Sequence, residues 1–235
     1  MPELGVVVVC VFDGHGGNRA SLYAQRRLPD MITARLSADS TQEHTINALK
    51  LSFLEFDNEF FGALAQLPRQ PGSKGVLNAG ACALVALVRG RELYVANAGD
   101  CRAVLATRGA GTVSTKALST DHTCLVEAEA ALVRGRSRDP DPIRRSVGDI
   151  AAGAGPMRVA GSLAVTRALG DAYLKREDMS FVPFSKGTPF ITCLPEVTHT
   201  TLTPGTDVAL VMATDGVWDT VSNNLAVAAA LDFPP

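Results

Sequence analysis

Residues 6–17 read Val-Val-Val-Val-Cys-Val-Phe-Asp-Gly-His-Gly-Gly. The β-branched and aromatic run, bounded by Gly5 and by Asp13-Gly14, predicts a buried strand over residues 5–12 that ends in a loop. The glycines let the backbone turn sharply and expose a carbonyl next to the Asp13 carboxylate. Hard cations such as Mg²⁺ and Mn²⁺ bind such oxygens, and His15 is suited to proton transfer. The alternative is an ordinary glycine-rich turn.

A second strand that ends in Asp-Gly lies near the other end of the chain. The apolar run of residues 208–212 leads into Ala213-Thr-Asp-Gly-Val-Trp-Asp219, with carboxylates at Asp215 and Asp219. Asp219 follows Asp215 by four residues, a spacing that allows its carboxylate to point toward the same site as that of Asp215. The alternative is another turn, with Trp218 as a core residue. Two strand-end Asp-Gly sites in one chain favour a shared acidic metal site.

Three further motifs leave their roles open. Residues 158–171 predict a turn and a short helix over 163–170, in which Arg158 or Arg167 binds phosphate or pairs with Asp171 or another carboxylate. In residues 97–104 a tight Gly-Asp turn joins two strands, and we favour a structural hairpin there. Asp121 precedes His122 after a predicted strand, where it is an N-cap, a turn residue or a metal ligand.

The remaining pattern predicts helices first and antiparallel strands afterwards. This order indicates an α+β layered domain. The expected elements are a helix over 18–36 kinked or restarted at Pro29, a helix to residue 66 opened by a Ser40-x-x-Glu43 capping box, a strand meander over 80–118, a helix over 125–134, a surface loop over 135–157, an irregular segment over 171–189, strands near 196–202 and 207–213, and a helix from Ser222.

Composition excludes several classes of protein. The 235 residues are 46% hydrophobic with a formal net charge of -2, and no basic stripe suggests nucleic acid. The five cysteines have no zinc-like or disulfide-like spacing. The apolar run of residues 6–12 is too short for a signal peptide or a membrane span. We therefore expect an intracellular, cytoplasmic or nuclear monomer with no membrane segment and no nucleic-acid partner.

The order of these motifs resembles the PPM family, the metal-dependent (type 2C) protein serine/threonine phosphatases. The resemblance covers roughly residues 6–228, and it rests on motifs that occur in a fixed order. They are Phe-Asp-Gly-His-Gly-Gly from residue 12, Ala-Asn-Ala-Gly-Asp-Cys-Arg-Ala-Val from residue 96, Asp121-His122, Gly-Ser-Leu-Ala-Val-Thr-Arg-Ala-Leu-Gly-Asp from residue 161, Pro195-Glu-Val197 and Ala213-Thr-Asp-Gly-Val-Trp-Asp219.

The resemblance implies an α-β-β-α sandwich of two antiparallel sheets flanked by helices. It implies that a metal-activated water hydrolyses phosphoserine or phosphothreonine in phosphoproteins, with two Mg²⁺ or Mn²⁺ ions and, in some members of the family, a third, weakly bound ion. By match of motif, Asp13 and Asp215 are ligands, the Gly14 carbonyl is another, and His15 is the general acid. Asp121 and Asp219 match the third-metal positions, and residues 172–194 match the flap that often sets substrate preference.

The chain also departs from the family pattern near both ends. Only Glu3 stands before Asp13, where members carry an arginine and a Glu-Asp pair, and Asp232 precedes Phe-Pro-Pro where members have Asp-Asn. We therefore expect a single partial domain over 1–235, truncated at both ends and incomplete at the sheet edges. The loss of two carboxylates and one arginine predicts weaker metal binding and low activity. The alternative is a catalytically impaired pseudophosphatase that acts as a binding module. Ala79-Gly-Ala-Cys82 replaces Ser-Gly-x-Thr, a change that we expect to affect packing.

Overall fold

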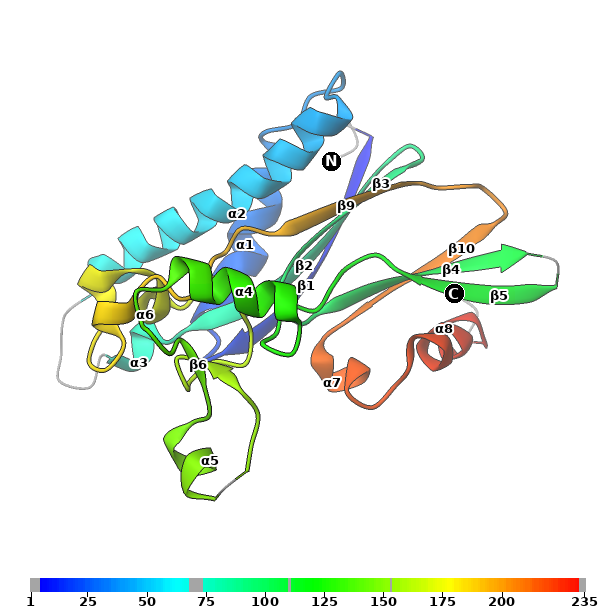
Figure 1. Ribbon diagram of the computed structural model, residues 1–235. Coiled ribbons are helices and arrows are strands. Elements are labelled where there is room, and N and C mark those ends of the chain that lie inside the picture. The colour runs from blue at the N-terminus through cyan, green and yellow to red at the C-terminus, as the bar shows by residue number, and fades with distance from the viewer. Residues whose placement is uncertain (1–4, 68–73, 110, 153, 233–235) are drawn as a thin grey trace.

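Two antiparallel sheets form the centre of the molecule (Figure 1). The computed structural model describes residues 5–67, 74–109, 111–152 and 154–232. The larger sheet has the order β1-β2-β3-β9, with the short strand β8 paired to β2, and the smaller sheet has the order β10-β4-β5. Their bounds are β1 Val6–His15, β2 Gly80–Arg89, β3 Glu92–Ala98, β8 Leu169–Gly170 and β9 Glu196–Thr201, then β10 Asp207–Ala213, β4 Arg102–Gly109 and β5 Thr112–Ala117.

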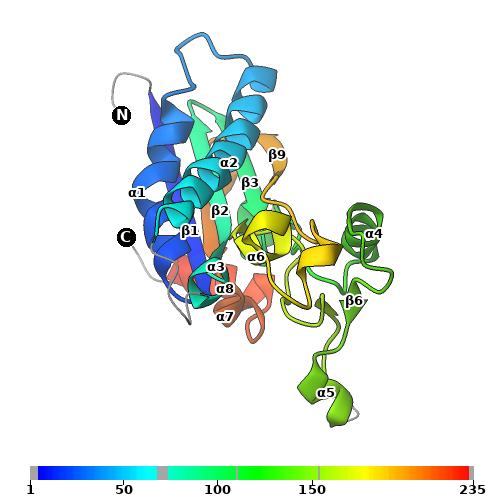
Figure 2. The ribbon, with the colours of Figure 1, turned by 90° about the vertical axis from the view of Figure 1, so that its left-hand side faces the viewer.

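Helices cover the outer faces of both sheets. Helices α1 and α2 lie along the larger sheet, and α8 packs against the smaller one (Figure 1). The bounds are α1 Arg19–Thr33, α2 Gln42–Ala65, α3 Lys74–Leu77, α4 Glu127–Arg136, α5 Val147–Ala151, α6 Ala172–Lys175, α7 Asp215–Trp218 and α8 Asn223–Asp232, with single 3-10 turns at Glu177–Met179 and Ser185–Gly187 and a two-strand ribbon of β6 Ile143–Arg144 and β7 Arg158–Val159. Helix α5 projects from the rest of the molecule (Figure 2).

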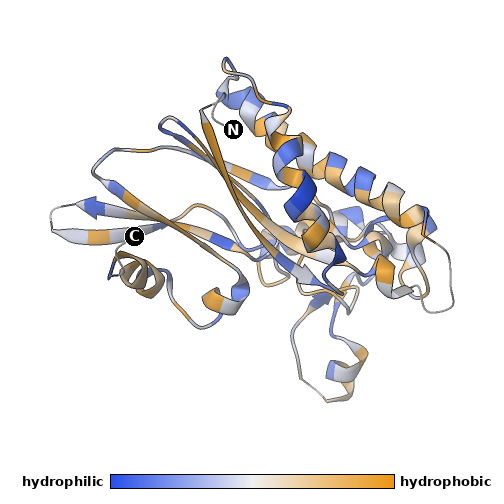
Figure 3. Cartoon of the chain, turned by 180° about the vertical axis from the view of Figure 1, so that it is seen from behind, coloured by the Kyte–Doolittle hydropathy of each residue, from blue (hydrophilic) through white to orange (hydrophobic). Residues whose placement is uncertain are grey.

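The side-chain period of two in the central strands explains this layering. In β2, Ala83, Val85 and Leu87 pack with α1 and α2, while Leu84 and Ala86 enter the core between the two sheets. Successive residues of a strand point to opposite faces, so β2, which is apolar on both faces, is covered on both. The strands of this sheet are accordingly coloured mostly as hydrophobic, while α1 and α2 alternate (Figure 3). The predicted α-β-β-α sandwich is confirmed. The prediction of a buried strand over residues 5–12 is only partly right, because β1 lies at the end of the strand order and exposes Val7 and Val9.

The prediction of a short helix over 163–170 is wrong. The segment is extended, with isolated bridges from Val165 to Thr123 and from Arg167 to Thr192, and it ends in β8. Val165 and Thr166 are buried there. The burial of these β-branched side chains and their pairing with neighbouring segments outweigh the helical spacing of the sequence.

The predicted meander and the first helices also need correction. Strands β3 and β4 do not pair, because each belongs to a different sheet, so the Gly99-Asp100 turn is a crossing between sheets and not a hairpin. Helix α1 runs through Pro29 without a restart. The second helix is capped by Thr41, whose side chain accepts a hydrogen bond from the His44 amide, one residue later than the predicted capping box. No helix among the described residues is long and apolar enough to cross a membrane.

A buried ion pair joins α2 to α6. The Lys175 ammonium binds the Asp57 carboxylate, and the two side chains are only 8% and 7% exposed. Asp57 also accepts a hydrogen bond of 2.7 Å from the Gly170 amide, and Lys175 donates to the Ala168 carbonyl at 2.6 Å. Burial nevertheless keeps the pKa of Asp57 raised, with Lys175 acting to lower it. The pair therefore fixes the segment that leads into residue 171.

Replacing Lys175 by methionine is expected to destabilise the fold by about 3–5 kcal/mol, because it leaves the buried Asp57 charge without a partner. Urea unfolding followed by circular dichroism measures this loss. Lys116→Met on the exposed strand β5 is the matched control and is expected to change stability by less than about 0.5 kcal/mol. Equal midpoints for the two variants would refute a structural role for the pair.

Candidate active site

Three carboxylates from different elements meet at one end of the two sheets. Asp13 lies near the end of β1 in the larger sheet, and Asp215 begins α7 directly after β10 in the smaller sheet. Asp100 lies in the crossing from β3 to β4. Asp13, Asp100 and Asp215 line one pocket of about 510 Å³. The sandwich therefore brings together two carboxylates that lie about two hundred residues apart in the sequence.

The carboxylates of this cluster are partly buried and repel one another. Burial and a hydrogen-bonding contact with Asp215 raise the pKa of Asp13, and the charges of Asp215 and Asp100 add to the effect. Burial also raises the pKa of Asp100. The Cys82 thiol donates a hydrogen bond of 3.1 Å to Oδ1 of Asp100, and this contact acts to lower the pKa. Like charges in contact disfavour ionisation unless a cation lies between them. The site is therefore an acidic cluster that favours positive charge.

His15 lies beside this cluster and is held by a buried carboxylate. Its Nε2 lies 2.7 Å from Oδ2 of Asp171, which is fully buried. Because an ionised carboxylate can only accept, Nε2 donates, and Nδ1 is left for other contacts. Burial lowers the pKa of His15, but the hydrogen bond and charge of Asp171, together with Asp100 and Asp13, outweigh it, so that the pKa is raised. Asp13 and His15 share one face of β1 because they are two residues apart.

Asp171 owes its position to unusual backbone geometry. Its φ of 52° lies in the left-handed region, and its amide donates to the Ala79 carbonyl at 2.9 Å. Such a conformation persists only when the surroundings enforce it. Gly80 faces the pair, and a Cβ at this position would collide with Oδ2 of Asp171 and Nε2 of His15. Glycine is therefore required here for the His15–Asp171 contact.

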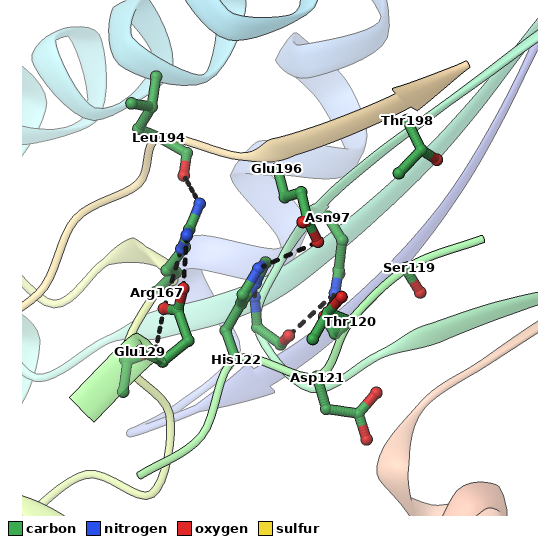
Figure 4. A network of polar contacts seen from close by, with 12 residues as sticks. Asn97, Ser119, Thr120, Asp121, His122, Glu129, Arg167, Leu194, Glu196 and Thr198 are labelled. Atoms are coloured by element: carbon green, nitrogen blue, oxygen red, sulfur yellow. Dashed lines mark hydrogen bonds and ion pairs between the residues drawn. The ribbon is translucent and has the colours of Figure 1, made fainter. Parts of the chain in front are cut away.

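The two candidate phosphate-binding arginines lie in different environments. Arg158, from β7, lines the pocket with the carboxylates, and its side chain has no hydrogen bond or ion pair within the described part of the chain. Arg167 is outside the pocket lining, where it binds Glu129 through two nitrogens and the Leu194 carbonyl through a third (Figure 4). Arg167 thus forms a structural ion pair with Glu129 and does not enter the pocket. Neither arginine pairs with Asp171.

Asp121 and Asp219 are also outside the residues that line the pocket. Asp121 forms a two-point pair with Arg102, and Figure 4 shows its carboxylate turned away from the His122 side chain. His122 is buried, and its Nδ1 accepts a hydrogen bond of 3.3 Å from the Gly99 amide. Burial lowers the pKa of His122 to about 4, so it is neutral near pH 7 and its 3.7 Å approach to Glu196 is not an ion pair. His122 therefore braces the loop that carries Asp100.

Comparisons with known proteins identify the family of this chain. The family model described as Protein phosphatase 2C matches residues 3–233. The chain belongs to the protein phosphatase 2C family. It is 37% identical over 227 residues to "Probable protein phosphatase 2C 74" of Oryza sativa subsp. japonica, covering 92% of this chain and 47% of the relative. It is 34% identical to "Probable protein phosphatase 2C 63" of Arabidopsis thaliana, covering 96% and 60%. The chain thus spans about half the length of its curated relatives.

Solved structures show that the protein phosphatase 2C fold is shared as well. The crystal structure of a serine-threonine phosphatase 2C from Toxoplasma gondii aligns with a TM-score of 0.71 at 21% identity, covering 98% of this chain and 76% of that one. A C. elegans sex determining protein aligns with a TM-score of 0.72 at 22% identity, covering 97% and 48%. At these identities the likeness concerns the fold, and it supports the sandwich described above.

The metal dependence of the protein phosphatase 2C family can be compared with the donor atoms of this chain. Among the described residues, no group of three or more His, Cys, Asp or Glu side chains is arranged as a finished metal site. The donor chemistry nevertheless fits a hard divalent cation, because Asp13 and Asp215 are in direct contact and Asp100 adds a third negative charge. Burial is the largest cause of the raised pKa of Asp13, and repulsion from Asp215 and Asp100 adds to it; a cation between these oxygens would remove the repulsion. Asp121 fits a divalent cation less well, because both of its carboxylate oxygens already accept hydrogen bonds from Arg102.

Two residues of this site were not assigned to it from the sequence. The sequence motifs favour Asp100 as the structural residue of a hairpin and Asp171 as a partner of an arginine. Both follow a glycine directly at the end of an apolar segment, as Asp215 follows an apolar strand. That repeated pattern was the available signal, but only the crossing of β3 to β4 brings Asp100 to the cluster.

Proposed function

We propose that this chain hydrolyses phosphoserine and phosphothreonine in phosphoproteins with the help of Mg²⁺ or Mn²⁺. The observation that supports it best is a single pocket that combines the Asp13–Asp215–Asp100 cluster, the His15–Asp171 pair and Arg158. Hydrolysis of a phosphate ester needs neutralisation of the charge on the phosphoryl oxygens and protonation of the oxygen of the leaving group. These side chains provide the ligands for the first requirement and an acid for the second.

The residues proposed to hold the metal are Asp13, Asp215 and the Gly14 carbonyl, with Asp100 as an additional carboxylate. Two ions, when bound, supply Lewis-acid stabilisation of phosphoryl oxygens and activation of water. Oxygen ligands suit Mg²⁺ and Mn²⁺ alike. The contact between Asp13 and Asp215 supports this assignment, because two carboxylates that share a space are stabilised by a cation placed between them.

His15 is proposed as the general acid and Asp171 as its positioning residue. With Nε2 donating to Asp171, the imidazolium keeps its Nδ1 proton for the departing serine or threonine oxygen. The buried carboxylate fixes the ring orientation and stabilises the charged ring before the proton leaves. The acid role of His15 was expected from the resemblance, whereas the role of Asp171 rests on the contact between them.

Arg158 is proposed to bind the substrate phosphate. Its guanidinium carries five donors and has no partner within the described part of the chain, although it lines an acidic pocket. The aromatic ring of Tyr173 lines the same pocket and belongs to residues 172–194. We place substrate preference in that segment. No contact among these residues favours the non-catalytic binding module.

The gap left by Gly80 offers a test of the His15–Asp171 pair. Gly80→Ala is expected to push the two side chains apart and to lower the rate on a phosphothreonine peptide by up to about 100-fold, because small misplacements of catalytic groups have large effects. Gly62→Ala in α2, where a Cβ meets nothing within 4 Å, is the control and is expected to keep full activity. A Gly80→Ala enzyme with normal turnover would contradict the positioning role.

The proposed function is tested by phosphate release from a phosphothreonine peptide. We expect release that requires Mn²⁺ or Mg²⁺, stops with a chelator and resumes when metal is restored. Equal release with and without metal, or none at any metal concentration from a chain shown to be folded by circular dichroism, would contradict the proposal.

A further inference from the structure

The guanidinium group of Arg102 is bound on three sides. Its Nε donates to Oδ1 of Asp121 at 3.0 Å and its Nη2 to Oδ2 at 2.6 Å, so one donor faces each carboxylate oxygen. Its Nη1 donates to Oδ1 of Asn223 at 2.9 Å. The carbon of the guanidinium group lies 5.3 Å from the centre of the Trp218 ring. Arg102 thus links β4 to the segment before α4 and to the last two helices.

The geometry is that of a strong ion pair. Two parallel charge-assisted hydrogen bonds between a guanidinium and a carboxylate are stronger and more specific than a single contact. The Arg102 and Asp121 side chains are 25% and 26% exposed, so the pair is partly shielded from water. The hydrogen bond and charge of Asp121, together with the charge of Asp219, raise the pKa of Arg102. One internal cation therefore already acts on both carboxylates.

The contact with Trp218 connects this pair to the proposed active site. Trp218 is the last residue of α7, whose first residue is Asp215, and its indole nitrogen donates to the Ala213 carbonyl at 2.9 Å. Arg102 lies over its ring, where cation–π attraction adds to the packing. The Arg102–Asp121 pair thus helps to hold the short helix that presents Asp215.

We propose that Arg102 is the built-in cation for Asp121, so that Asp121 anchors α7 and α8 to the smaller sheet and does not bind a divalent ion. This goes beyond the proposed function, which concerns Asp13 and Asp215, and it replaces the expectation that Asp121 holds a third metal. A divalent ion would have to compete with the positive charge of a guanidinium that donates to both carboxylate oxygens. A lysine could not take this place, because its ammonium lacks the planar fork.

The first test counts bound Mn²⁺ by equilibrium dialysis. Asp121→Asn is expected to bind as many ions as the unmodified chain, with each dissociation constant within about two-fold, whereas Asp215→Asn loses at least one ion. The double variant Arg102→Gln/Asp121→Asn leaves no unpaired charge, and it is expected to keep the same number of ions. Loss of one ion in either variant that lacks Asp121 would overturn the proposal, independently of whether the chain has phosphatase activity.

The second test measures the anchoring role by thermal unfolding. Arg102→Gln and Asp121→Asn are each expected to lower the midpoint, and the double variant to lower it no further than the worse single variant, because the two residues act as one unit. Arg134→Gln, which breaks an exposed ion pair with Glu127, is the matched control and is expected to leave the midpoint nearly unchanged. Additive losses in the double variant would refute the pair as an anchor.

Discussion

Asp13→Asn is expected to reduce metal-supported phosphate release by roughly 10²–10⁴-fold, because the stabilisation that bound metal gives a phosphoryl transition state amounts to several kcal/mol. Asp13 lies in contact with Asp215 and within the field of Asp100, so its loss removes a ligand at the centre of the cluster. The measurement is the initial rate on a phosphothreonine peptide at saturating Mn²⁺, together with the Mn²⁺ dissociation constant, which is expected to rise.

Asp39→Asn provides the control for the first prediction. Asp39 is exposed and far in sequence from the cluster, and its replacement changes the net charge by the same amount. We expect normal rates and normal Mn²⁺ affinity for this variant. An Asp13→Asn enzyme that kept more than a tenth of the rate would show that Asp13 is not an essential ligand.

His15→Gln is expected to affect substrates according to their leaving group. A threonine alkoxide is a poor leaving group that needs a proton, so the rate on a phosphothreonine peptide should fall by about 10²-fold or more. The leaving group of p-nitrophenyl phosphate is the weakly basic p-nitrophenolate, which needs little protonation. The rate on this substrate should therefore fall by less than about ten-fold. Asp171→Asn should show the same pattern with smaller losses, since it acts through His15.

His44→Gln is the control for this second prediction, because His44 is exposed at the start of α2. It is expected to leave both rates unchanged. Equal losses on the two substrates for His15→Gln would mean that His15 supports binding or folding and does not donate the proton.

Local patterns were sufficient to single out the two carboxylates that we propose as the main metal ligands. Asp13 and Asp215 each follow an apolar run and precede a glycine. The order of elements predicted an α+β layered domain, and the resemblance to the PPM family predicted the two-sheet sandwich correctly. Pairing between distant strands carries no such local signal. For this reason Asp100 was assigned to a hairpin, although β3 and β4 enter different sheets.

Tertiary contacts also decided the outcome for residues 163–170 and for the arginines. The burial of Val165 and Thr166 outweighed the helical spacing of that segment. Arg167 forms an ion pair with Glu129 on α4 and therefore does not bind phosphate in the pocket. The left-handed backbone of Asp171 depends on its contact with Ala79, which no motif reveals. The sequence thus identified Asp13, His15 and Asp215 as site candidates, while the places of Asp100 and Asp171 followed from the packing.

The central claim is that Asp13 and Asp215 form the core of a divalent-metal centre between the ends of the two sheets. Anomalous diffraction from crystals grown with Mn²⁺ tests it most directly, because the signal locates the metal without reference to activity. The account predicts strong manganese peaks within coordination distance of the Asp13 and Asp215 carboxylates, and their loss in Asp13→Asn. A folded chain with no peak at these two carboxylates, at Mn²⁺ concentrations that saturate binding in solution, would contradict the account.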